Sequence, residues 1–501
     1  MSQDEQEEVL DFLGDPTTYG DALVKRIDTH AASVFLVGRR ALKVKRAVRF
    51  PVLDYSTLAK RQAACAAEIE VNRTFAPTIY RGVVAITREA NGSLAIGGKG
   101  EPVEWAVEMR RFDETRTLDH LASEIDARLA DALGCAVARA HAAAPVLTSA
   151  GFVEALAEIV AQNDAELAGS PALFAPDQVR ALTAATRATL SRVRPLIAAR
   201  ERAGRVARCH GDLHLGNIVL IDGEPVLFDA IEFDPRIATG DVLYDLAFLL
   251  MDLIERRLRP AANIVLNRYI METQHTDDLD ALVALPLYLS LRAAIRAKVA
   301  AERQIRDASI EQSARDYFAL AQRLLAPPAP RLIAIGGLSG TGKSLLARAL
   351  APEILPEPGA VWLRSDVERK AMFGAAETKR LSPEAYTRDT TKRVYEVLYN
   401  KTRRVLDAGH SAIVDAVFAD PAERASIAQA GAGAGFRGLF LTTPMAIRIN
   451  RVCKRAGDAS DADAAVARAQ EGYDLGVMEW QQIDGSGTPE ETLQRTQAAL
   501  R

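Results

Sequence analysis

Residues 337–344, GLSGTGKS, carry the clearest chemical signal in this chain of 501 residues. They match the phosphate-binding P-loop pattern G-x-x-x-x-G-K-[ST] at every fixed position. Glycines in such a loop let backbone N–H groups surround a phosphate, and the helix that follows adds the partial positive charge of its N-terminus. Lys343 is predicted to reach the β- and γ-phosphates of a nucleotide, and the Ser344 hydroxyl to bind Mg²⁺. The predicted nucleotide contacts are Gly337, Leu338, Ser339, Gly340, Thr341, Gly342, Lys343 and Ser344.

The residues on either side of this loop predict the strand and the helix that it needs. Residues 331–336, RLIAIG, are typical of a short buried strand, and residues 345–350, LLARAL, have helical spacing and good helix formers. A strand, a glycine-rich turn and a helix are the context in which this pattern binds phosphate.

Two acids further along are predicted to lie at the same edge of a parallel sheet. Residues 360–364 predict a strand just before Asp366, and the apolar run 410–418, HSAIVDAVF, contains Asp415. Ligands of open parallel sheets collect at the C-terminal ends of the strands. Asp366, with Arg369 beside it, is therefore predicted to meet an acceptor hydroxyl, although a helix N-cap is the alternative role for Asp366. Asp415 is predicted to hold Mg²⁺ directly or through water.

A basic run from residue 448 to residue 455 is predicted to form a helix near the nucleotide. Its arginines recur at three- and four-residue spacing and therefore share one helix face. Arg451 and Arg455 are predicted to close over the nucleotide as part of a lid. For Arg448 a plain solvated face is nearly as well supported.

A second dense motif lies far upstream, at residues 209–220, CHGDLHLGNIVL. A turn at residues 222–223 follows it, and then the segment 225–234, PVLFDAIEFD. Two strands with an acid at the far end, preceded by Asp and Asn five positions apart (Asp212 and Asn217), have the spacing of a kinase catalytic loop and its metal-binding acid. His210 and His214 are predicted to shape this loop rather than to act in chemistry.

The elements before this motif offer a lysine and an acid that can orient it. Residues 33–37 and 40–46 predict a hairpin, in whose second strand Lys43 and Lys45 share one face. A helix predicted at 56–75 carries Glu68 and Glu70. Lys43 is predicted to bind the α- and β-phosphates, with Glu68 as its partner. Lys45 and Glu70 remain alternatives, because the sequence does not fix the register.

The length and composition predict a multidomain globular protein. A chain of 501 residues is too long for one ordinary core, and 49% hydrophobic with 26% charged residues is typical of globular proteins. The proline-rich segment LAPPAP at 325–330 is the clearest break. We therefore expect one domain at 1–325, a linker at 326–330 and a second domain at 331–501.

Several classes of protein are disfavoured by composition. The net charge of −4, with no aromatic and basic stripe, argues against nucleic-acid binding. Four cysteines without CxxC spacing argue against zinc. The acidic N-terminus and the lack of an apolar run of about 20 residues argue against a signal peptide and a membrane span. We expect a cytoplasmic protein, with no prediction for its oligomeric state.

The motif at 209–220 resembles the loop H-G-D-x-H-x-x-N of the aminoglycoside phosphotransferase family, which includes choline and homoserine kinase-like proteins. The resemblance implies that Asp212 is the catalytic base and that Asn217 and Asp229 are Mg²⁺ ligands. The segment before residue 33 departs from protein kinases, because it lacks their G-x-G-x-x-G loop over the phosphates. This favours the small-molecule branch.

The last third of the chain resembles P-loop small-molecule kinases, including gluconate kinase-like and zeta toxin-like proteins. The P-loop, the SDxxRK segment at 365–370 and the VDA segment at 414–416 carry this resemblance. Nearly the whole chain resembles bacterial fusions of the two kinds of kinase. The implied fold is an α+β, protein kinase-like, two-lobed domain followed by an α/β P-loop NTPase domain with a parallel sheet.

These features together predict a bifunctional ATP (or GTP) and Mg²⁺-dependent alcohol phosphotransferase. Its acceptor would be a small hydroxylated metabolite such as a sugar, a nucleoside or an aminoglycoside. Two alternatives are a single live kinase with the other domain as a nucleotide-binding regulator, and a toxin-like or nucleic-acid-end kinase in the P-loop half. The catalytic candidates are Asp212, Asp366, Lys343 and Arg455.

Overall fold

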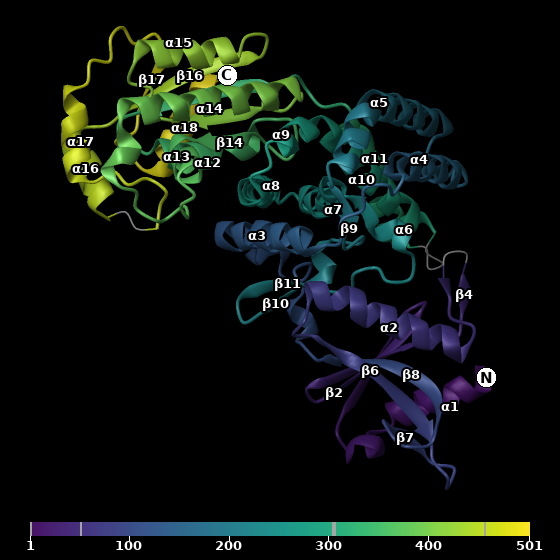
Figure 1. Ribbon diagram of the computed structural model, residues 1–501. Coiled ribbons are helices and arrows are strands. Elements are labelled where there is room, and N and C mark those ends of the chain that lie inside the picture. The colour runs from purple at the N-terminus through teal and green to yellow at the C-terminus, as the bar shows by residue number, and fades with distance from the viewer. Residues whose placement is uncertain (1–2, 51–52, 303–306, 455–456, 501) are drawn as a thin grey trace. The chain divides into compact units, whose positions relative to one another are not determined.

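The computed structural model describes residues 3–50, 53–302, 307–454 and 457–500 (Figure 1). The chain forms two compact units. Unit 1 consists of Met1–Gln162 and Arg194–Asp252, and unit 2 consists of Asn163–Val193 and Leu253–Arg501. Each unit contains one of the two predicted phosphate-binding motifs, and the two units are described separately below.

Unit 1 begins with an antiparallel six-stranded sheet in the order β1-β2-β3-β8-β6-β7. The helix α1 (Gln3–Gly14) contributes Val9 and Leu13 to the apolar core of this sheet, together with Phe35. The helix α2 (Leu58–Phe75) packs against β6 and β8. The strands are β1 (Val24–Asp28), β2 (Ala32–Val37), β3 (Arg40–Lys45), β6 (Tyr80–Arg88), β7 (Leu94–Ile96) and β8 (Glu101–Arg110), with a short hairpin of β4 (Arg49–Phe50) and β5 (Leu53–Asp54).

The predicted hairpin is confirmed in β2 and β3, where Val34 pairs with Lys43. Its two-residue turn places Gly38 at a φ of 52°, a conformation that glycine adopts without strain. The start of the sheet could therefore be predicted because each of its signals is local.

The rest of unit 1 is mostly helical and carries the second motif on short strands. The strands β10 and β11 form an antiparallel hairpin with Asp222 and Gly223 in its turn, both at positive φ, as Asp-Gly turns favour. The elements are α3 (Ala127–Ala143), β9 (Val206–Arg208), β10 (Ile218–Ile221), β11 (Glu224–Leu227), α6 (Pro235–Ala238) and β12 (Thr239–Asp241). Three helices have residues in both units: α4 (Phe152–Ala168), α5 (Pro176–Arg202) and α7 (Val242–Glu255).

Unit 2 is built around a parallel five-stranded sheet in the order β14-β15-β13-β16-β17. Alternate strand residues, including Ile333 and Ile335, pack with Leu346 and Leu350 of the helix after the P-loop. The strands are β13 (Arg331–Gly337), β14 (Val361–Arg364), β15 (Ala412–Asp415), β16 (Gly435–Thr442) and β17 (Gln481–Asp484). The predicted parallel α/β sheet is thereby confirmed.

Helices surround this sheet and continue unit 2 upstream of it (Figure 1). The helices after β13 are α12 (Lys343–Leu350), α13 (Ser365–Met372), α14 (Arg388–Asp407), α15 (Pro421–Ala430), α16 (Met445–Lys454), α17 (Ala464–Ala469) and α18 (Pro489–Leu500). Those before it are α8 (Arg259–Thr273), α9 (Asp277–Ala281), α10 (Leu285–Ala301) and α11 (Ala308–Leu325). Residues 327–330 between α11 and β13 are neither helix nor strand.

None of the helices in the described part of the chain combines the length and the apolarity needed to cross a membrane.

Unit 2 is expected to lose stability as the pH is lowered, because His410 is buried just before β15. Its Nε2 hydrogen-bonds the Gly359 carbonyl at 2.9 Å, and burial lowers the pKa of His410 from 6.5 to about 4, against the opposing effect of that bond. Between these two values only the unfolded chain takes up the proton, so unfolding of unit 2 should become easier by up to about 1.4 kcal/mol per pH unit as the pH falls.

The variant His410→Gln keeps an N–H donor for Gly359 and does not titrate. Urea unfolding of the full chain at pH 7 and pH 5 should show a smaller loss of stability for this variant than for the wild type. His275→Gln, at an exposed position before α9, is the matched control and should retain the wild-type pH dependence. Equal pH dependence in all three proteins would contradict the assignment.

Candidate active sites

The P-loop of unit 2 connects β13 to α12 as predicted. Gly342 at the N-cap of α12 has a φ of 98°, and Gly340 has a φ of 86°. A Cβ atom at Gly340 would lie 2.6 Å from the carbonyl oxygen of Arg448, so a side chain there would collide with the backbone of α16. The glycine pattern thus fits both the conformation of the loop and its close approach to α16.

Asp415 lies at the C-terminal end of β15, beside the start of the P-loop. Parallel pairing puts Asp415 opposite Ile335 of β13. The carboxyl is buried, and burial raises its pKa, while Lys343, Arg364 and a hydrogen bond with Ser344 act in the opposite direction. The predicted metal ligands Ser344 and Asp415 are therefore brought together, with Lys343 close by.

Asp366 lies in the first turn of α13, directly after β14. The N-cap position is occupied by Arg364, so the alternative role of Asp366 as an N-cap residue is wrong. The negative charge of Asp366 contributes to raising the pKa of Asp415, which places the two acids in one electrostatic environment. Arg369 is buried, donates to the Ala385 carbonyl at 2.6 Å and packs over a tyrosine ring, which gives it a structural role.

The guanidinium groups of the α16 arginines donate hydrogen bonds to backbone carbonyls of other segments. Arg448 is only 2% exposed, so the solvated face considered for it is wrong. Its Nε donates to the Ser339 carbonyl at 3.0 Å and its guanidinium also bonds the Ala467 carbonyl and Glu471. The Ser339 contact ties Arg448 directly to the P-loop.

Arg451 is one turn further along α16. Its guanidinium donates to the carbonyls of Gly485 at 2.7 Å and Gly487 at 2.9 Å, and more weakly to Thr341 of the P-loop at 3.3 Å. In this structure Arg451 thus connects the P-loop to the segment after β17, and its role as a lid residue stays a prediction. Arg455 lies outside the described residues, and its role as a lid residue stays a prediction.

Four charged residues of unit 2 were given no role by sequence reasoning. Arg364 contacts Asp415 at 3.7 Å and donates to Asp458 at 2.8 Å, while Lys370 pairs with Asp461 at 2.6 Å. Asp458 and Asp461 belong to the segment after α16. The sequence signal was weak, because only the position of Arg364 at the end of a predicted strand pointed to it.

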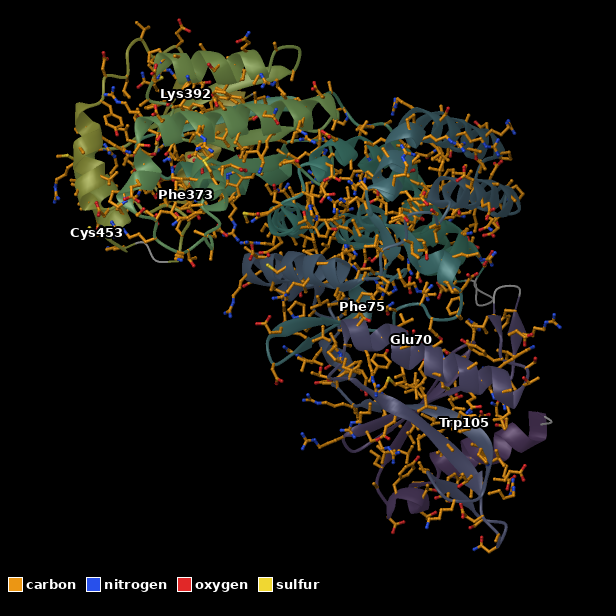
Figure 2. The ribbon with its side chains drawn as sticks, in the orientation of Figure 1. Glu70, Phe75, Trp105, Phe373, Lys392 and Cys453 are labelled. Carbon is orange, nitrogen blue, oxygen red and sulfur yellow. The ribbon has the colours of Figure 1, made fainter. Side chains whose placement is uncertain are left out.

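In unit 1 the predicted lysine and acid form a buried ion cluster. Lys43 Nζ lies 2.9 Å from Glu68 and 2.7 Å from Asp229, while Lys45 contacts both Glu68 and Glu232. Glu68 thus forms ion pairs with both lysines. The predicted partner Lys43 and its alternative Lys45 are therefore both correct. Glu70 is exposed on α2 (Figure 2), so it is not the buried partner of either lysine.

Electrostatics explain why the carboxylates of this cluster stay ionised, although Glu68 is fully buried. Burial acts to raise the pKa of Glu68, but the nearby ammonium groups of Lys43 and Lys45 outweigh it and lower the value. The pKa of Asp229 is lowered in the same way, by Lys43 against burial. Removing either lysine would leave a buried carboxylate poorly compensated, which is unfavourable by several kcal/mol.

The loop that carries Asp212 is closed by Asn217. The Asn217 Nδ2 donates to the backbone carbonyl of Asp212 at 3.0 Å and to its Oδ2 at 3.1 Å. His214 Nε2 lies 3.4 Å from the same carboxylate, and His214 Nδ1 accepts from Gly216 N at 3.1 Å. The loop therefore holds a partly exposed carboxylate in a fixed position, as a proton acceptor requires.

His210 is buried and structural in this arrangement. Its Nε2 hydrogen-bonds the Phe228 carbonyl at 2.9 Å, and its ring packs edge-on against the ring of Phe75. Figure 2 shows Phe75 at the end of α2. Burial lowers the pKa of His210, against the pull of nearby acids, Asp245 foremost. A neutral ring suits a packing residue between α2 and the loop.

Sequence reasoning missed two side chains that hold the backbone of this site. Asn72 of α2 accepts from Ala230 N at 2.7 Å and donates to its carbonyl at 3.1 Å, which fixes the chain just after Asp229. Asp245 of α7 accepts from the amides of His210 and Gly211. Neither role could be recognised in the sequence, because the backbone groups that Asn72 and Asp245 bind are distant from them along the chain.

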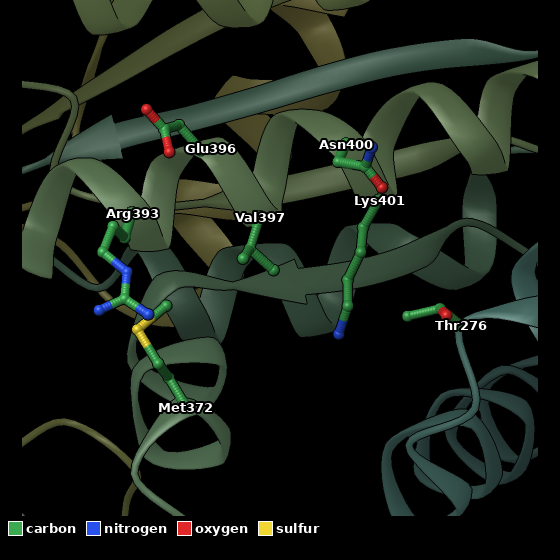
Figure 3. A pocket seen from close by; sticks show the side chains of 7 residues that line it. All are labelled: Thr276, Met372, Arg393, Glu396, Val397, Asn400 and Lys401. Carbon is green, nitrogen blue, oxygen red and sulfur yellow. The ribbon is translucent and has the colours of Figure 1, made fainter.

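Two surface pockets lie away from these residues. A pocket of about 370 Å³ in unit 2 is lined by side chains of α13 and α14 and by Thr276 (Figure 3). Lys401, one of the lining residues, pairs with Glu368 at 2.7 Å. A second pocket of about 440 Å³ in unit 1 lies near Arg39, Arg111 and Asp222. The predicted site residues line neither pocket.

Both sites offer the hard oxygen ligands that Mg²⁺ prefers. In unit 2 these are the Ser344 hydroxyl and the buried Asp415 carboxylate. In unit 1 Asp229 supplies a carboxylate, and the amide oxygen of Asn217 is the atom left after its nitrogen bonds Asp212. The donor sets therefore fit Mg²⁺, with no sulfur or imidazole ligand in either.

Comparisons with known proteins assign the two candidate sites to two different protein families. Residues 57–282 match the model of the phosphotransferase enzyme family, and residues 332–473 match that of an AAA domain. The chain is 30% identical, over 93% of both lengths, to an uncharacterized protein of Mycobacterium tuberculosis strain H37Rv. The chain belongs to the family of this mycobacterial protein. A Mycobacterium bovis relative, also called uncharacterized, shows the same identity and coverage.

This chain thus joins a phosphotransferase region to an AAA region, as the two resemblances predicted. Solved structures similar to each region are known. A choline/ethanolamine kinase family protein from Mesorhizobium loti is 16% identical and covers 64% of this chain and 95% of its own, with a TM-score of 0.40. A sugar kinase from a Janibacter species is 20% identical and covers 34% of this chain and 94% of its own, with a TM-score of 0.28.

Arg448 offers a test of how the P-loop of the AAA region is held. Arg448→Met removes a buried guanidinium that donates to Ser339 O, and each charge-assisted hydrogen bond lost contributes about 1.5–3 kcal/mol. We expect nucleotide affinity at the P-loop to fall at least about tenfold. The measurement is titration calorimetry with Mg²⁺ and a nonhydrolysable ATP analogue.

Lys454→Ala is the matched control, because Lys454 is an exposed cation on the same helix. It should bind the analogue as the wild type does. Wild-type affinity in Arg448→Met would show that the P-loop keeps its shape without this contact.

Proposed function

We propose that this protein is an ATP- and Mg²⁺-dependent phosphotransferase with two nucleotide sites. Each site would transfer the γ-phosphate of ATP to a hydroxyl of a small metabolite such as a sugar, a nucleoside or an aminoglycoside. The observation that carries the proposal is the P-loop of unit 2, where Lys343, Ser344 and Asp415 converge. The ion cluster of Lys43, Glu68 and Asp229 supports a second site in unit 1.

In the phosphotransferase region each residue has a distinct task. Lys43 would bind the α- and β-phosphates, and Glu68 would orient its ammonium group. Asp212 would align the acceptor hydroxyl and take its proton, since its carboxylate is partly exposed and held by Asn217. Asn217 and Asp229 would hold Mg²⁺, which neutralises phosphate charge when bound.

In the AAA region the backbone amides of the P-loop and Lys343 would bind the phosphates. Ser344 and Asp415 would hold Mg²⁺, and Asp366 would face the acceptor hydroxyl from the neighbouring strand end. Both sites would act by positioning and charge neutralisation, without a covalent intermediate. The proposed boundary between the catalytic domains is the segment 326–330.

Two other functions are weaker. In the first, one region is a nucleotide-binding regulator, but both regions keep their expected acids. Asp229 lies beside Lys43, and Asp415 interacts with Lys343. In the second, the AAA region acts on nucleic-acid ends, but the net charge of −4 provides no general attraction for a polyanion.

The test is a product assay with a panel of sugars, nucleosides and aminoglycosides. Asp212→Asn and Lys343→Ala should each lower one phosphorylated product, or one of two successive steps, at least about 100-fold, because each removes a group used in only one site. Products are followed with γ-labelled ATP and mass spectrometry.

Two matched controls keep the interpretation specific. Asp222→Asn changes an acid in the turn between β10 and β11, and Lys392→Ala changes an exposed lysine of α14 (Figure 2). Both should leave all products at wild-type levels. Loss of every product in either active-site variant would indicate a single site, and unchanged turnover in both would overturn the catalytic assignment.

A further inference from the structure

Arg364 occupies an unusual electrostatic position at the end of β14. It pairs in register with Asp415 of β15, and its Nε lies 3.7 Å from the Asp415 carboxylate. Its Nη2 donates to Asp458 at 2.8 Å, and Nη1 lies 3.7 Å from Glu377. One guanidinium therefore contacts three acids, each from a different segment of unit 2.

This guanidinium is nearly buried and not fully satisfied. Arg364 is 9% exposed, and its Nε has no hydrogen-bond partner among the described residues. A buried N–H without a partner costs free energy, so it persists only where other contacts fix the side chain. The Nε faces the acid that we assign to Mg²⁺, and the other two acids fix the rest of the guanidinium.

The contact with Glu377 extends to a helix outside the AAA match. Glu377 Oε2 pairs with Arg268 Nη1 at 3.1 Å, and Arg268 belongs to α8. The phosphotransferase match spans residues 57–282 and includes α8, whereas Arg364, Glu377 and Asp415 fall within the AAA match at 332–473. Arg268, Glu377, Arg364 and Asp415 thus form a row of alternating charges within unit 2.

The same helix also holds the edge of the AAA sheet. β14 is an edge strand, whose outer backbone groups need partners. Asn267 accepts from Trp362 N at 2.7 Å, and both Asn263 and Asn267 donate to the Ala360 carbonyl. The side chains of α8 therefore fix the position of the strand that ends in Arg364.

We propose that Arg364 is a positioning residue for the metal-binding acid Asp415, and that Arg268 of the phosphotransferase region holds Arg364 in place through Glu377. The proposal rests on the proposed function of the P-loop site. Arg268 touches neither nucleotide nor acceptor in this assignment. It acts by keeping Glu377, and through it the guanidinium beside Asp415, in one orientation.

The consequence is that one region of the chain sets the metal affinity of the other. Without Arg268 the Glu377 carboxylate can turn, and Arg364 loses one of the acids that fix it. Asp415 is then less well placed for Mg²⁺. The effect belongs to the P-loop site alone, because the groups of the row lie in unit 2.

Arg268→Ala and Glu377→Gln test this in the full chain. Each should raise the Mg²⁺ concentration needed for half-maximal formation of the Lys343-dependent product about 3- to 10-fold, a range typical of coupling through a side-chain network. The Asp212-dependent product should keep its Mg²⁺ requirement. The double variant should be no worse than the single ones, since both break the same contact. Arg268→Lys should recover part of the loss.

Arg259→Ala is the matched control. Arg259 lies on the same helix and pairs with Glu357 of the AAA region at 2.9 Å, outside the row that ends at Asp415. It should lose as much thermal stability as Arg268→Ala but keep the wild-type Mg²⁺ requirement. An equal change in both variants, or none in Arg268→Ala, would overturn the positioning role.

Binding of a nonhydrolysable ATP analogue with and without Mg²⁺ separates this proposal from the function on which it rests. If the wild type shows no Lys343-dependent binding, the proposed nucleotide site fails. If the wild type binds and Arg268→Ala retains the full Mg²⁺ enhancement, the site stands and the positioning role fails.

Discussion

Charge that is buried must be paired, and both candidate sites are organised by this constraint. A carboxylate taken out of water costs several kcal/mol unless a cation and hydrogen bonds compensate it. Glu68 is fully buried and contacts two lysines, one of which reaches Asp229 and the other Glu232. Asp415 is buried beside Lys343 and Arg364. In each unit one of the compensating cations is the lysine that we propose to bind phosphate, Lys43 in unit 1 and Lys343 in unit 2.

This pairing gives the sites their shape before any ligand arrives. The groups that we assign to phosphate or metal are held by side chains with neither role, so less reorganisation would be needed on binding. Asn72 and Asp245 fix the backbone around the acids of unit 1. Arg448 fixes the P-loop at Ser339 in unit 2. These supporting residues come from helices distant in sequence, which explains why the motifs alone do not make the sites.

The parts that could be predicted are those whose signals are local. The P-loop, the hairpin of β2 and β3, and the Asp-Gly turn of β10 and β11 each follow from a few neighbouring residues. The parallel sheet with Asp415 at a strand end was also predicted, because an apolar run that ends in an acid is a local signal. The predicted meeting of Ser344 and Asp415 depended only on these elements.

What could not be predicted depends on distant partners. Arg448 lies on a helix with basic spacing, which is equally typical of a solvated face, yet packing against Ser339 and Ala467 buries it. The N-cap of α13 is Arg364, two positions before Asp366, which had been considered for that role. The composition of a segment does not fix the residue at which a helix begins. Arg364 has no motif of its own, since its importance comes from three acids in other segments.

The central claim, two nucleotide sites in one chain, is tested most directly by counting them. Titration calorimetry with a nonhydrolysable ATP analogue and Mg²⁺ should give two molecules bound per chain. Lys43→Met and Lys343→Ala should each reduce this to one, and the double variant should bind none. One molecule per wild-type chain, or loss of all binding in a single variant, would contradict the account.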